Sequence, residues 1–233
     1  MSYQPADRDT MYFIGVTTGK SSIMKVFPKW MQAMDVDLQI KGIDLPIHAD
    51  PEVYREVVTF IKNDPKSKGA LVTTHKIDLY EAAKDIFDYL DPYAQDFSEL
   101  SSISKSEDGK QLRGHAKDPI TCGMAMEEFI PENYWRDNPE AEVMIMGAGG
   151  SAISMCALLA DFPQGVQPRL DALREICEKL NPGTVEMAYH VTPNPGDNDR
   201  VLAGMAEGSL VVNATGLGKD RPGSPIGDEA LFP

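Results

Sequence analysis

The sequence predicts an α/β protein of two domains with largely parallel sheets. Short apolar runs alternate with segments of helical periodicity along almost the whole chain, which is the pattern of βαβ units. The length of 233 residues allows one large domain or two small ones, each with a sizeable core. We place the domains at residues 1–117 and 118–233 and expect a domain boundary or hinge in the polar stretch Pro131–Glu140.

The first domain is expected to begin with a βαβαβα series, because apolar runs of strand length are each followed by a helical stripe. The expected strands are Tyr12–Val16, Leu38–Ile43 and Gly69–Thr74, and the expected helices are Ser21–Asp35, Pro51–Asn63 and Leu79–Ile86. Pro28 should kink the first helix or mark its true first turn. The stretch Asp78–Glu99, with seven acids and one base, is interpreted as a solvated helix face.

A hairpin and a second α/β series follow. Two short strands flank the turn Glu107-Asp108-Gly109 within Ser101–His115, which is a hairpin pattern. The later elements are expected to be a helix over Ile120–Ile130, a strand over Glu142–Met146, helices over Ala152–Leu159 and Arg169–Leu180, and strands over Val185–Val191 and Leu210–Asn213. The second series therefore begins with a strand that leads into a glycine-rich turn.

Charge and composition exclude several classes of partner. The 22 Lys and Arg against 36 Asp and Glu give a formal charge of −14, which disfavours nucleic acid and anionic membranes. No run approaches the roughly 18 apolar residues of a membrane span, and the N-terminus lacks an apolar signal segment. Cys122, Cys156 and Cys177 form no C-x-x-C pair, which indicates buried thiols. We expect a cytoplasmic protein, and the four histidines show no metal-ligand spacing.

The strongest local motif is the glycine turn Gly147–Ala152, between an expected strand and an expected helix. It fits the pattern G-x-G-x-x-G/A, in which the first glycine makes the turn and the second lets a pyrophosphate approach the backbone. The N–H groups at the start of the helix would then hold the phosphates. The candidate cofactor-binding residues are Gly147, Ala148, Gly149, Gly150, Ser151 and Ala152. The alternative is a glycine turn with a packing role only.

A second loop, Gly15–Ser21, resembles a phosphate-binding loop but has three residues between its glycines, where a P-loop has four. A phosphate-loop NTPase is therefore a minor alternative. Lys20 and Ser21 remain candidates for holding a small anionic substrate, because they lie between a strand end and a helix start. An exposed lysine beside an N-cap serine is the competing interpretation.

Lys76 follows the third expected strand, after Thr73, at the sheet edge where ligands of open parallel sheets bind. A lysine there can give a proton to a developing alkoxide or take one from an alcohol. Asp118 is a candidate for its partner carboxylate. The competing interpretations are a surface lysine and a helix N-cap before Pro119.

The order of these motifs resembles the shikimate/quinate dehydrogenase family from Phe13 to Leu217, nearly the whole chain. The family's G-x-N-V-T-x-P-x-K is similar to Gly69–Lys76, its G-A-V-N-T to Ser101–Lys105, its D-G turn to Asp108-Gly109, and its G-x-N-T-D to Gly114–Asp118. The motifs G-A-G-G-x-A and N-A-T-x-x-G are kept as Gly147–Ala152 and Asn213–Gly218.

The resemblance implies an N-terminal, mostly parallel substrate domain and a C-terminal Rossmann-type domain that binds NAD(P). Lys76 and Asp118 would be the catalytic pair, which passes a proton while hydride moves between a ring carbon and nicotinamide. Asn213 and Thr215 would line the cofactor cleft beside the glycine turn. The substrate would be a small anionic hydroxy acid, and the protein a monomer or a homodimer.

Several positions depart from the family pattern. The family's first loop, Gly-…-Ser-x-Ser, is similar to Gly15–Ile23, but Ile23 replaces its second serine unless Ser22 serves instead. Leu71 replaces the asparagine of N-V-T, and the segment before Lys76 is one residue short. Ser104 replaces the asparagine of G-A-V-N-T, and Ala116-Lys117 replaces the N-T of the last motif. A site built for hydroxyl groups loses affinity without those partners, so we expect a substrate different from shikimate. The candidate substrate-binding residues are Lys20, Ser21, Ser22, Thr73 and Ser104, with Lys117 able to take over an anionic group.

The cofactor domain shows a second irregularity. Phe162–Val166 runs into a helix with no strand between, where a dinucleotide fold needs its second strand. Either the protein lacks this strand, which would leave a gap in the sheet, or residues are omitted from the chain; we favour omission of this strand and of a C-terminal element. Arg169 could reach a 2′-phosphate, which favours NADP over NAD. A sensor that binds nucleotide or metabolite without turnover is the main alternative to the enzyme, although retention of both Lys76 and Asp118 favours the enzyme.

Overall fold

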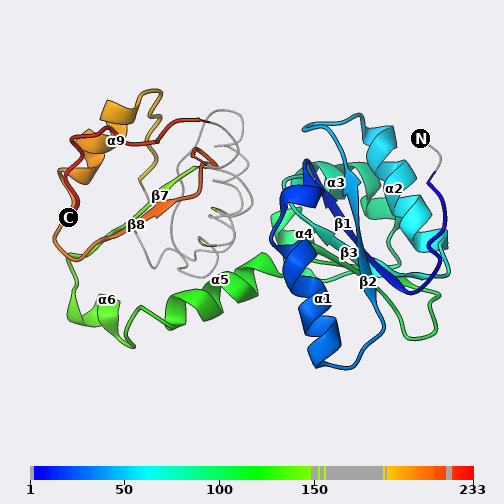
Figure 1. Ribbon diagram of the computed structural model, residues 1–233. Coiled ribbons are helices and arrows are strands. Elements are labelled where there is room, and N and C mark those ends of the chain that lie inside the picture. Colours follow the sequence, from blue (N-terminus) through cyan, green and yellow to red (C-terminus); the bar gives the residue numbers. More distant parts are fainter. Residues whose placement is uncertain (1–2, 148–151, 153–154, 156–185, 187, 219–221) are drawn as a thin grey trace. The chain divides into compact units, whose positions relative to one another are not determined.

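The computed structural model describes residues 3–147, 152, 155, 186, 188–218 and 222–233. The chain divides into two compact units, Met1–Lys117 (unit 1) and Asp118–Pro233 (unit 2) (Figure 1). Both units contain parallel strand pairs together with helices, which confirms the predicted α/β class.

Unit 1 is a six-stranded mixed sheet with the order β2-β1-β3-β5-β6-β4. Its elements are β1 (Thr10–Gly15), η1 (Thr18–Lys20), α1 (Ile23–Ala33), β2 (Gln39–Asp44), α2 (Pro51–Asn63), β3 (Ser67–Val72), α3 (Lys76–Ala83), η2 (Lys84–Ile86), β4 (Tyr89–Leu90), α4 (Pro92–Phe97), β5 (Ser102–Lys105) and β6 (Leu112–His115). The three strands of the βαβαβα series pair in parallel, and β5 and β6 form the expected hairpin. Every strand except β5 runs in the same direction.

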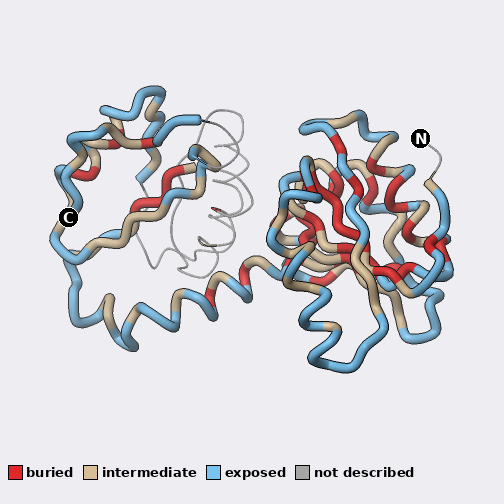
Figure 2. Tube along the Cα trace, viewed as in Figure 1, coloured by how far each residue is buried: buried red, intermediate tan, exposed pale blue. Residues whose placement is uncertain are grey.

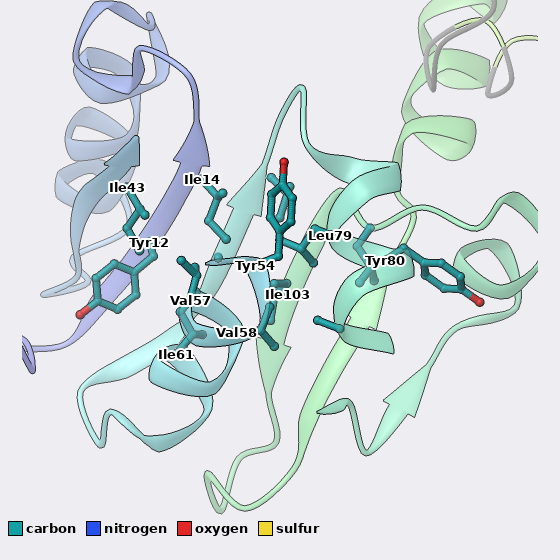
Figure 3. Close-up of a cluster of buried hydrophobic side chains, with 14 of the residues drawn as sticks. Tyr12, Ile14, Ile43, Tyr54, Val57, Val58, Ile61, Leu79, Tyr80 and Ile103 are labelled. Carbon is teal, nitrogen blue, oxygen red and sulfur yellow. The ribbon is translucent and has the colours of Figure 1, made fainter. Parts of the chain in front are cut away.

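The main core lies on one face of this sheet. Ile14 of β1 and Ile103 of β5 are fully buried there, against Val57, Val58 and Ile61 of α2 (Figure 3). The buried residues of unit 1 lie mainly on the inner strands and on α2 (Figure 2). Strand register places a second row of side chains on the opposite face, consisting of Phe13, Leu71, Ser102 and His115. The polar members of that row show that the two faces have different roles.

The acidic stretch differs most from its predicted structure. It is not one solvated helix face, because α3, η2, β4 and α4 divide it. Asp91 is the N-cap of α4, where its side chain accepts from the backbone N–H of Ala94 at 2.8 Å, and Pro92 takes the first helical position. Asp91 is 6% exposed and Glu99 is fully buried. The composition suggested solvation, but Asp91 is buried as the N-cap of α4, and Glu99 follows the left-handed Ser98 that ends this helix.

Two helices of unit 1 also differ from prediction. The third helix begins at Lys76, three residues before the expected Leu79. α1 begins at Ile23 rather than Ser21, and Pro28 lies inside it, which removes the first-turn alternative and leaves the kink as a prediction. α2 has the predicted bounds, because Asp50 and Pro51 start it and an apolar stripe faces the sheet.

Unit 2 contains a parallel pair of strands and three described helices. Its described elements are α5 (Asp118–Glu127), α6 (Tyr134–Asp137), β7 (Val143–Met146), α9 (Pro195–Leu202) and β8 (Leu210–Asn213). β7 pairs with β8 in parallel, and Met144, Met146 and Leu202 form a small core. The stretch expected to be a hinge contains α6, and α9 was not anticipated. Cys122, expected to be buried, is only half-buried on α5.

For the other predictions about unit 2, the structure describes few of the residues concerned. The strand expected over Val185–Val191 is wrong where it is described, since residues 186 and 188–191 are in no strand and Val191 is 59% exposed. An apolar run forms a strand only when a neighbouring strand pairs with it. Ala152 and Met155 are helical, but the rest of the helix expected after the glycine turn lies outside the described residues. So do the helix expected over Arg169–Leu180, the gap at Phe162–Val166, and two of the cysteines, Cys156 and Cys177.

Candidate functional site

The carboxyl edge of the unit 1 sheet gathers most of the predicted substrate-site segments. Backbone hydrogen bonds join its loops: Thr73 donates to Ile14 at 3.0 Å, Val72 to Ser101 at 2.9 Å, and Ser101 to His115 at 3.0 Å. The ends of β1, β3 and β6 and the start of β5 therefore lie side by side. Ligands of open α/β sheets bind at this edge.

Thr73 and Lys76 occupy this edge through a sharp turn after β3. A Cβ added to Gly15 would lie 3.0 Å from Thr73 Oγ1, so Thr73 lies directly against the end of β1. Thr74 has a φ of 39°, in the left-handed region that β-branched residues disfavour, and the N–H of His75 donates to the Thr73 carbonyl. Lys76 then begins α3. The shortened motif is thus accommodated by a strained residue, Thr74, two residues before the predicted catalytic lysine.

The side chain of His75 fastens this turn to the core of unit 1. It is 1% exposed, and its Nδ1 lies 3.0 Å from the Tyr54 hydroxyl. Burial lowers the pKa of His75, so its imidazole is neutral at pH 7. The side chain therefore anchors the start of α3 in the core and is not presented to a ligand.

The loop after β1 is tied to the end of β2. The carboxylate of Asp44 accepts hydrogen bonds from the backbone N–H of Thr18 at 2.8 Å and from its hydroxyl at 2.5 Å, which lower the pKa of Asp44. A phosphate-binding loop needs free backbone N–H groups, and here one of them meets a carboxylate, which disfavours the NTPase interpretation. Beyond this turn Lys20 and Ser22 are exposed and Ser21 is half-exposed.

Ser104 belongs to a hydrogen-bonded chain that the sequence did not predict. Its Oγ lies 3.2 Å from His115 Nε2, and His115 Nδ1 lies 3.3 Å from Asp91 Oδ2. Burial lowers the pKa of His115, so the imidazole is neutral at pH 7, and the ionised Asp91 can only accept. The proton of His115 is thus on Nδ1, and Ser104 donates to Nε2. The lone pairs of Ser104 remain available to accept a hydrogen bond from a ligand hydroxyl.

Asp91 connects this chain to the loop after β6. Burial acts to raise the pKa of Asp91, but the backbone N–H groups of Ala94 and Ala116 and the Lys117 ammonium outweigh it, so the pKa is lowered. Lys117 Nζ lies 3.3 Å from Asp91 Oδ2. The positive charge of Lys117 is therefore partly used within the protein.

Glu99 is a second acid that sequence reasoning missed. It is fully buried between α4 and β5, and neither carboxyl oxygen meets a hydrogen-bond donor within the described part of the chain. Burial raises the pKa of Glu99 to about 7, and the field of Lys76 opposes this rise. No local pattern distinguishes Glu99 from the solvated acids around it, so only packing reveals it.

Unit 2 holds the predicted cofactor-binding residues. Gly147 ends β7 with a φ of 120°, and a Cβ there would lie 2.7 Å from the Ala214 carbonyl oxygen. Asn213 Oδ1 accepts from the backbone N–H of Thr215 at 3.0 Å and from its hydroxyl at 2.7 Å. Asn213 and Thr215 are both exposed at the carboxyl end of β8. A glycine is therefore required where the two parallel strands end side by side.

The remaining predicted site residues divide into two groups. Ala152 is helical and buried, whereas Ala148, Gly149, Gly150 and Ser151 lie outside the described residues. Asp118 is the half-exposed first residue of α5 in unit 2, whereas Lys76 belongs to unit 1. The pairing of Lys76 with Asp118 therefore stays a prediction.

Other kinds of site are few in the part of the chain that the structure describes. No group of three His, Cys, Asp or Glu there could hold a metal ion. No described helix is long and apolar enough to cross a membrane. A pocket of about 430 Å³ is lined by Met31 of α1 and Ile40 of β2. It also reaches Leu38 at the start of β2, so it lies at the amino edge of the sheet, away from Lys76.

Solved structures of known proteins share the fold of this chain. No family model matches the chain, and neither does any curated protein. Among solved structures, the fold of this chain is that of two-domain dehydrogenases. A shikimate dehydrogenase in complex with NADP⁺ superposes with a TM-score of 0.70 and 21% identity, over 99% of this chain and 75% of that one.

Two further structures agree. Quinate dehydrogenase from Corynebacterium glutamicum in complex with NAD has a TM-score of 0.67 and 17% identity, over 96% and 77% of the two chains. Shikimate 5-dehydrogenase from Thermus thermophilus in complex with NADP(H) and shikimate has a TM-score of 0.66 and 20% identity, over 96% and 75%. The resemblance stated from the motifs is thus confirmed at the level of the fold.

Proposed function

We propose that this chain is an NAD(P)-dependent oxidoreductase of the shikimate dehydrogenase type. It would transfer hydride between nicotinamide and the hydroxyl or keto group of a shikimate- or quinate-like hydroxy acid other than shikimate. The observation that carries the proposal is the place of Lys76, which begins α3 after the short turn that follows β3, at the carboxyl edge of a sheet. The sheet belongs to a fold shared with dehydrogenases solved with NAD or NADP.

The described residues of unit 2 fit a dinucleotide. Gly147 leaves no side chain at the end of β7, and the exposed Asn213 and Thr215 follow the adjacent strand. The N–H groups of the predicted turn residues that follow Gly147 would hold the pyrophosphate. Bound NAD(P) supplies the hydride donor or acceptor. A preference for NADP rests on Arg169, which lies outside the described residues.

Proton transfer would fall to Lys76, with Asp118 as its partner carboxylate. In the oxidising direction the Lys76 amine takes the hydroxyl proton of the substrate, and in the reducing direction its ammonium returns a proton to the carbonyl oxygen. A substrate hydroxyl can donate to Ser104, because the Ser104 proton is directed at His115. These roles match a hydroxylated substrate.

The anionic group of the substrate is best matched by Lys20. Lys117 lies 3.3 Å from Asp91, whereas Lys20 forms no ion pair with any described residue and is exposed next to Ser21. Thr73, Ser21 and Ser22 would complete the polar contacts. We further propose that the protein acts in the cytoplasm as a monomer or homodimer.

The test is a panel of cyclic and linear hydroxy acids with NAD⁺ and NADP⁺, followed at the absorbance of reduced nicotinamide. We expect turnover with at least one acid, and its loss in Lys76→Ala with cofactor binding retained. Lys84→Ala is the control, because Lys84 is exposed and paired with Glu81. Turnover of shikimate with a sub-millimolar KM would contradict the proposed difference in substrate.

A sensor without turnover is the second candidate. It is favoured by Leu71, an apolar residue on the sheet face beside Ser102, where the family pattern has an asparagine. Cofactor binding without reduction by any acid of the panel would decide for the sensor. Unchanged turnover in Lys76→Ala would remove Lys76 from the proposed mechanism.

A further inference from the structure

Glu99 occupies a position that folding alone does not explain. A carboxyl group without a hydrogen-bond donor is costly to bury, and a buried acid normally has a compensating partner. Glu99 is fully buried, and neither of its oxygens is hydrogen-bonded within the described residues. Methionine or leucine would fill the same space without that cost. An acid here therefore suggests a role for its charge.

The backbone holds Glu99 close to Lys76. α4 ends at Phe97, and Ser98 takes a left-handed conformation with a φ of 50°, which turns the chain inward. Two residues after Ser98, the backbone N–H of Leu100 donates to the carbonyl oxygen of Lys76 at 3.1 Å. Glu99 thus sits one residue before the hydrogen bond that fastens this segment to the first residue of α3.

The charge that acts on Glu99 is that of Lys76, whose field favours the ionised carboxylate against the cost of burial. The titratable groups on neighbouring elements are engaged elsewhere. Asp78 of α3 pairs with His48, and Asp91 is bonded by backbone N–H groups and His115. Among the described residues, Lys76 is thus the charged group that is coupled to the Glu99 carboxylate.

We propose that Glu99 is a positioning residue that sets the proton affinity of Lys76 from beneath the site. The inference rests on the proposed function, in which Lys76 exchanges a proton with the substrate. When the substrate O–H bond breaks, a new N–H bond makes Lys76 an ammonium, and ionised Glu99 stabilises that charge. In the opposite direction the ammonium gives its proton to the carbonyl oxygen while the new C–H bond forms. Glu99 itself touches neither substrate nor cofactor.

The direct test measures Lys76 without requiring activity. The pH dependence of acetylation of Lys76 by acetic anhydride, followed by peptide mass spectrometry, gives the midpoint of its deprotonation. In Glu99→Gln the loss of a nearby negative charge should lower that midpoint by about one pH unit. Glu81→Gln is the control, because Glu81 lies on the same helix but is exposed, and it should leave the midpoint unchanged. Coincident curves for wild type and Glu99→Gln would overturn the proposal.

The second readout is the pH profile of turnover in the oxidising direction, which needs neutral Lys76. Its rising limb should move down by the same amount in Glu99→Gln, whereas a purely structural role would lower kcat without moving the limb. Glu99→Met, similar in shape and uncharged, serves if the glutamine variant does not fold. If the wild type oxidises no acid of the panel, the proposed function fails, and the acetylation curves still decide the role of Glu99.

Discussion

The backbone N–H of Leu100 donates to the carbonyl oxygen of Lys76 at 3.1 Å, across the edge of the unit 1 sheet. This bond joins the start of α3 to the segment that leads into β5. It brings the predicted catalytic lysine next to the buried acid Glu99 although the two are far apart in sequence. The same backbone hydrogen bond therefore holds Lys76 at the sheet edge and fastens α3 to the segment before β5 in unit 1.

Glu99→Met should stabilise unit 1 at neutral and higher pH. Burial raises the pKa of Glu99 from 4.5 to about 7, so its contribution to stability is fully present below pH 4.5 and is lost as the pH rises through 7. The gain of the variant over wild type should grow across this window to on the order of 3 kcal/mol. Urea unfolding monitored by Trp30 in a Trp135→Phe background follows unit 1. An equal difference at pH 4.5 and pH 8 would contradict the expectation.

Gly147→Ala should impair unit 2 and leave unit 1 folded. The new Cβ would lie 2.7 Å from the Ala214 carbonyl oxygen, and the φ of 120° is strained for any residue with a side chain. We expect a loss of stability of a few kcal/mol, measured through Trp135 in a Trp30→Phe background, and at least a tenfold weaker affinity for NAD(P). Gly196→Ala is the control, because no atom lies within 4 Å of its added Cβ. An unchanged affinity for NAD(P) would show that the turn at Gly147 does not take part in cofactor binding.

Gly42→Ala should weaken substrate binding through the loop after β1. Its added Cβ would overlap the Thr18 side chain, whose hydroxyl and backbone N–H are held by Asp44. Displacing Thr18 would move the turn that carries Lys20, so KM for the best hydroxy acid should rise several-fold with little change in kcat. In the same loop, Gly19→Ala meets open space and should leave KM unchanged. Equal constants for the two variants would show that this loop does not bind substrate.

Asp91→Ala should destabilise unit 1 by about 1–2 kcal/mol at pH 7, because it removes the N-cap of α4. Hydrogen bonds keep the pKa of Asp91 below its usual value, despite burial. Its contribution is therefore present above about pH 4 and is lost as the pH falls through the lowered pKa. The difference between wild type and variant, measured by urea unfolding, should shrink below pH 4. Gln95→Ala is the control, because it removes an uncharged side chain from the same helix, and a difference for Asp91→Ala that did not shrink at low pH would contradict the expectation.

Elements that depend on local sequence patterns were predicted correctly, whereas an element that depends on pairing with a distant segment was missed. β8 and α2 have their predicted bounds, because a strand run and an apolar stripe are local signals. β4 was missed because two residues, Tyr89 and Leu90, carry no periodicity. Its presence depends on pairing with β6, which lies more than twenty residues later. Asp91 and Glu99, which follow β4, were therefore misread as solvated, whereas Glu81, Asp85 and Asp88 before it are exposed as predicted.

The sequence by itself determined the α/β class, the strand β7 that leads into Gly147, and the place of Lys76 shortly after a strand end, because each follows from neighbours in the chain. Only the tertiary structure decided that Glu99, among many acids, is buried beside Lys76, and that Ser104, His115 and Asp91 form one hydrogen-bonded chain. Burial and strand register depend on packing between distant segments, and the same amino-acid composition is compatible with either environment.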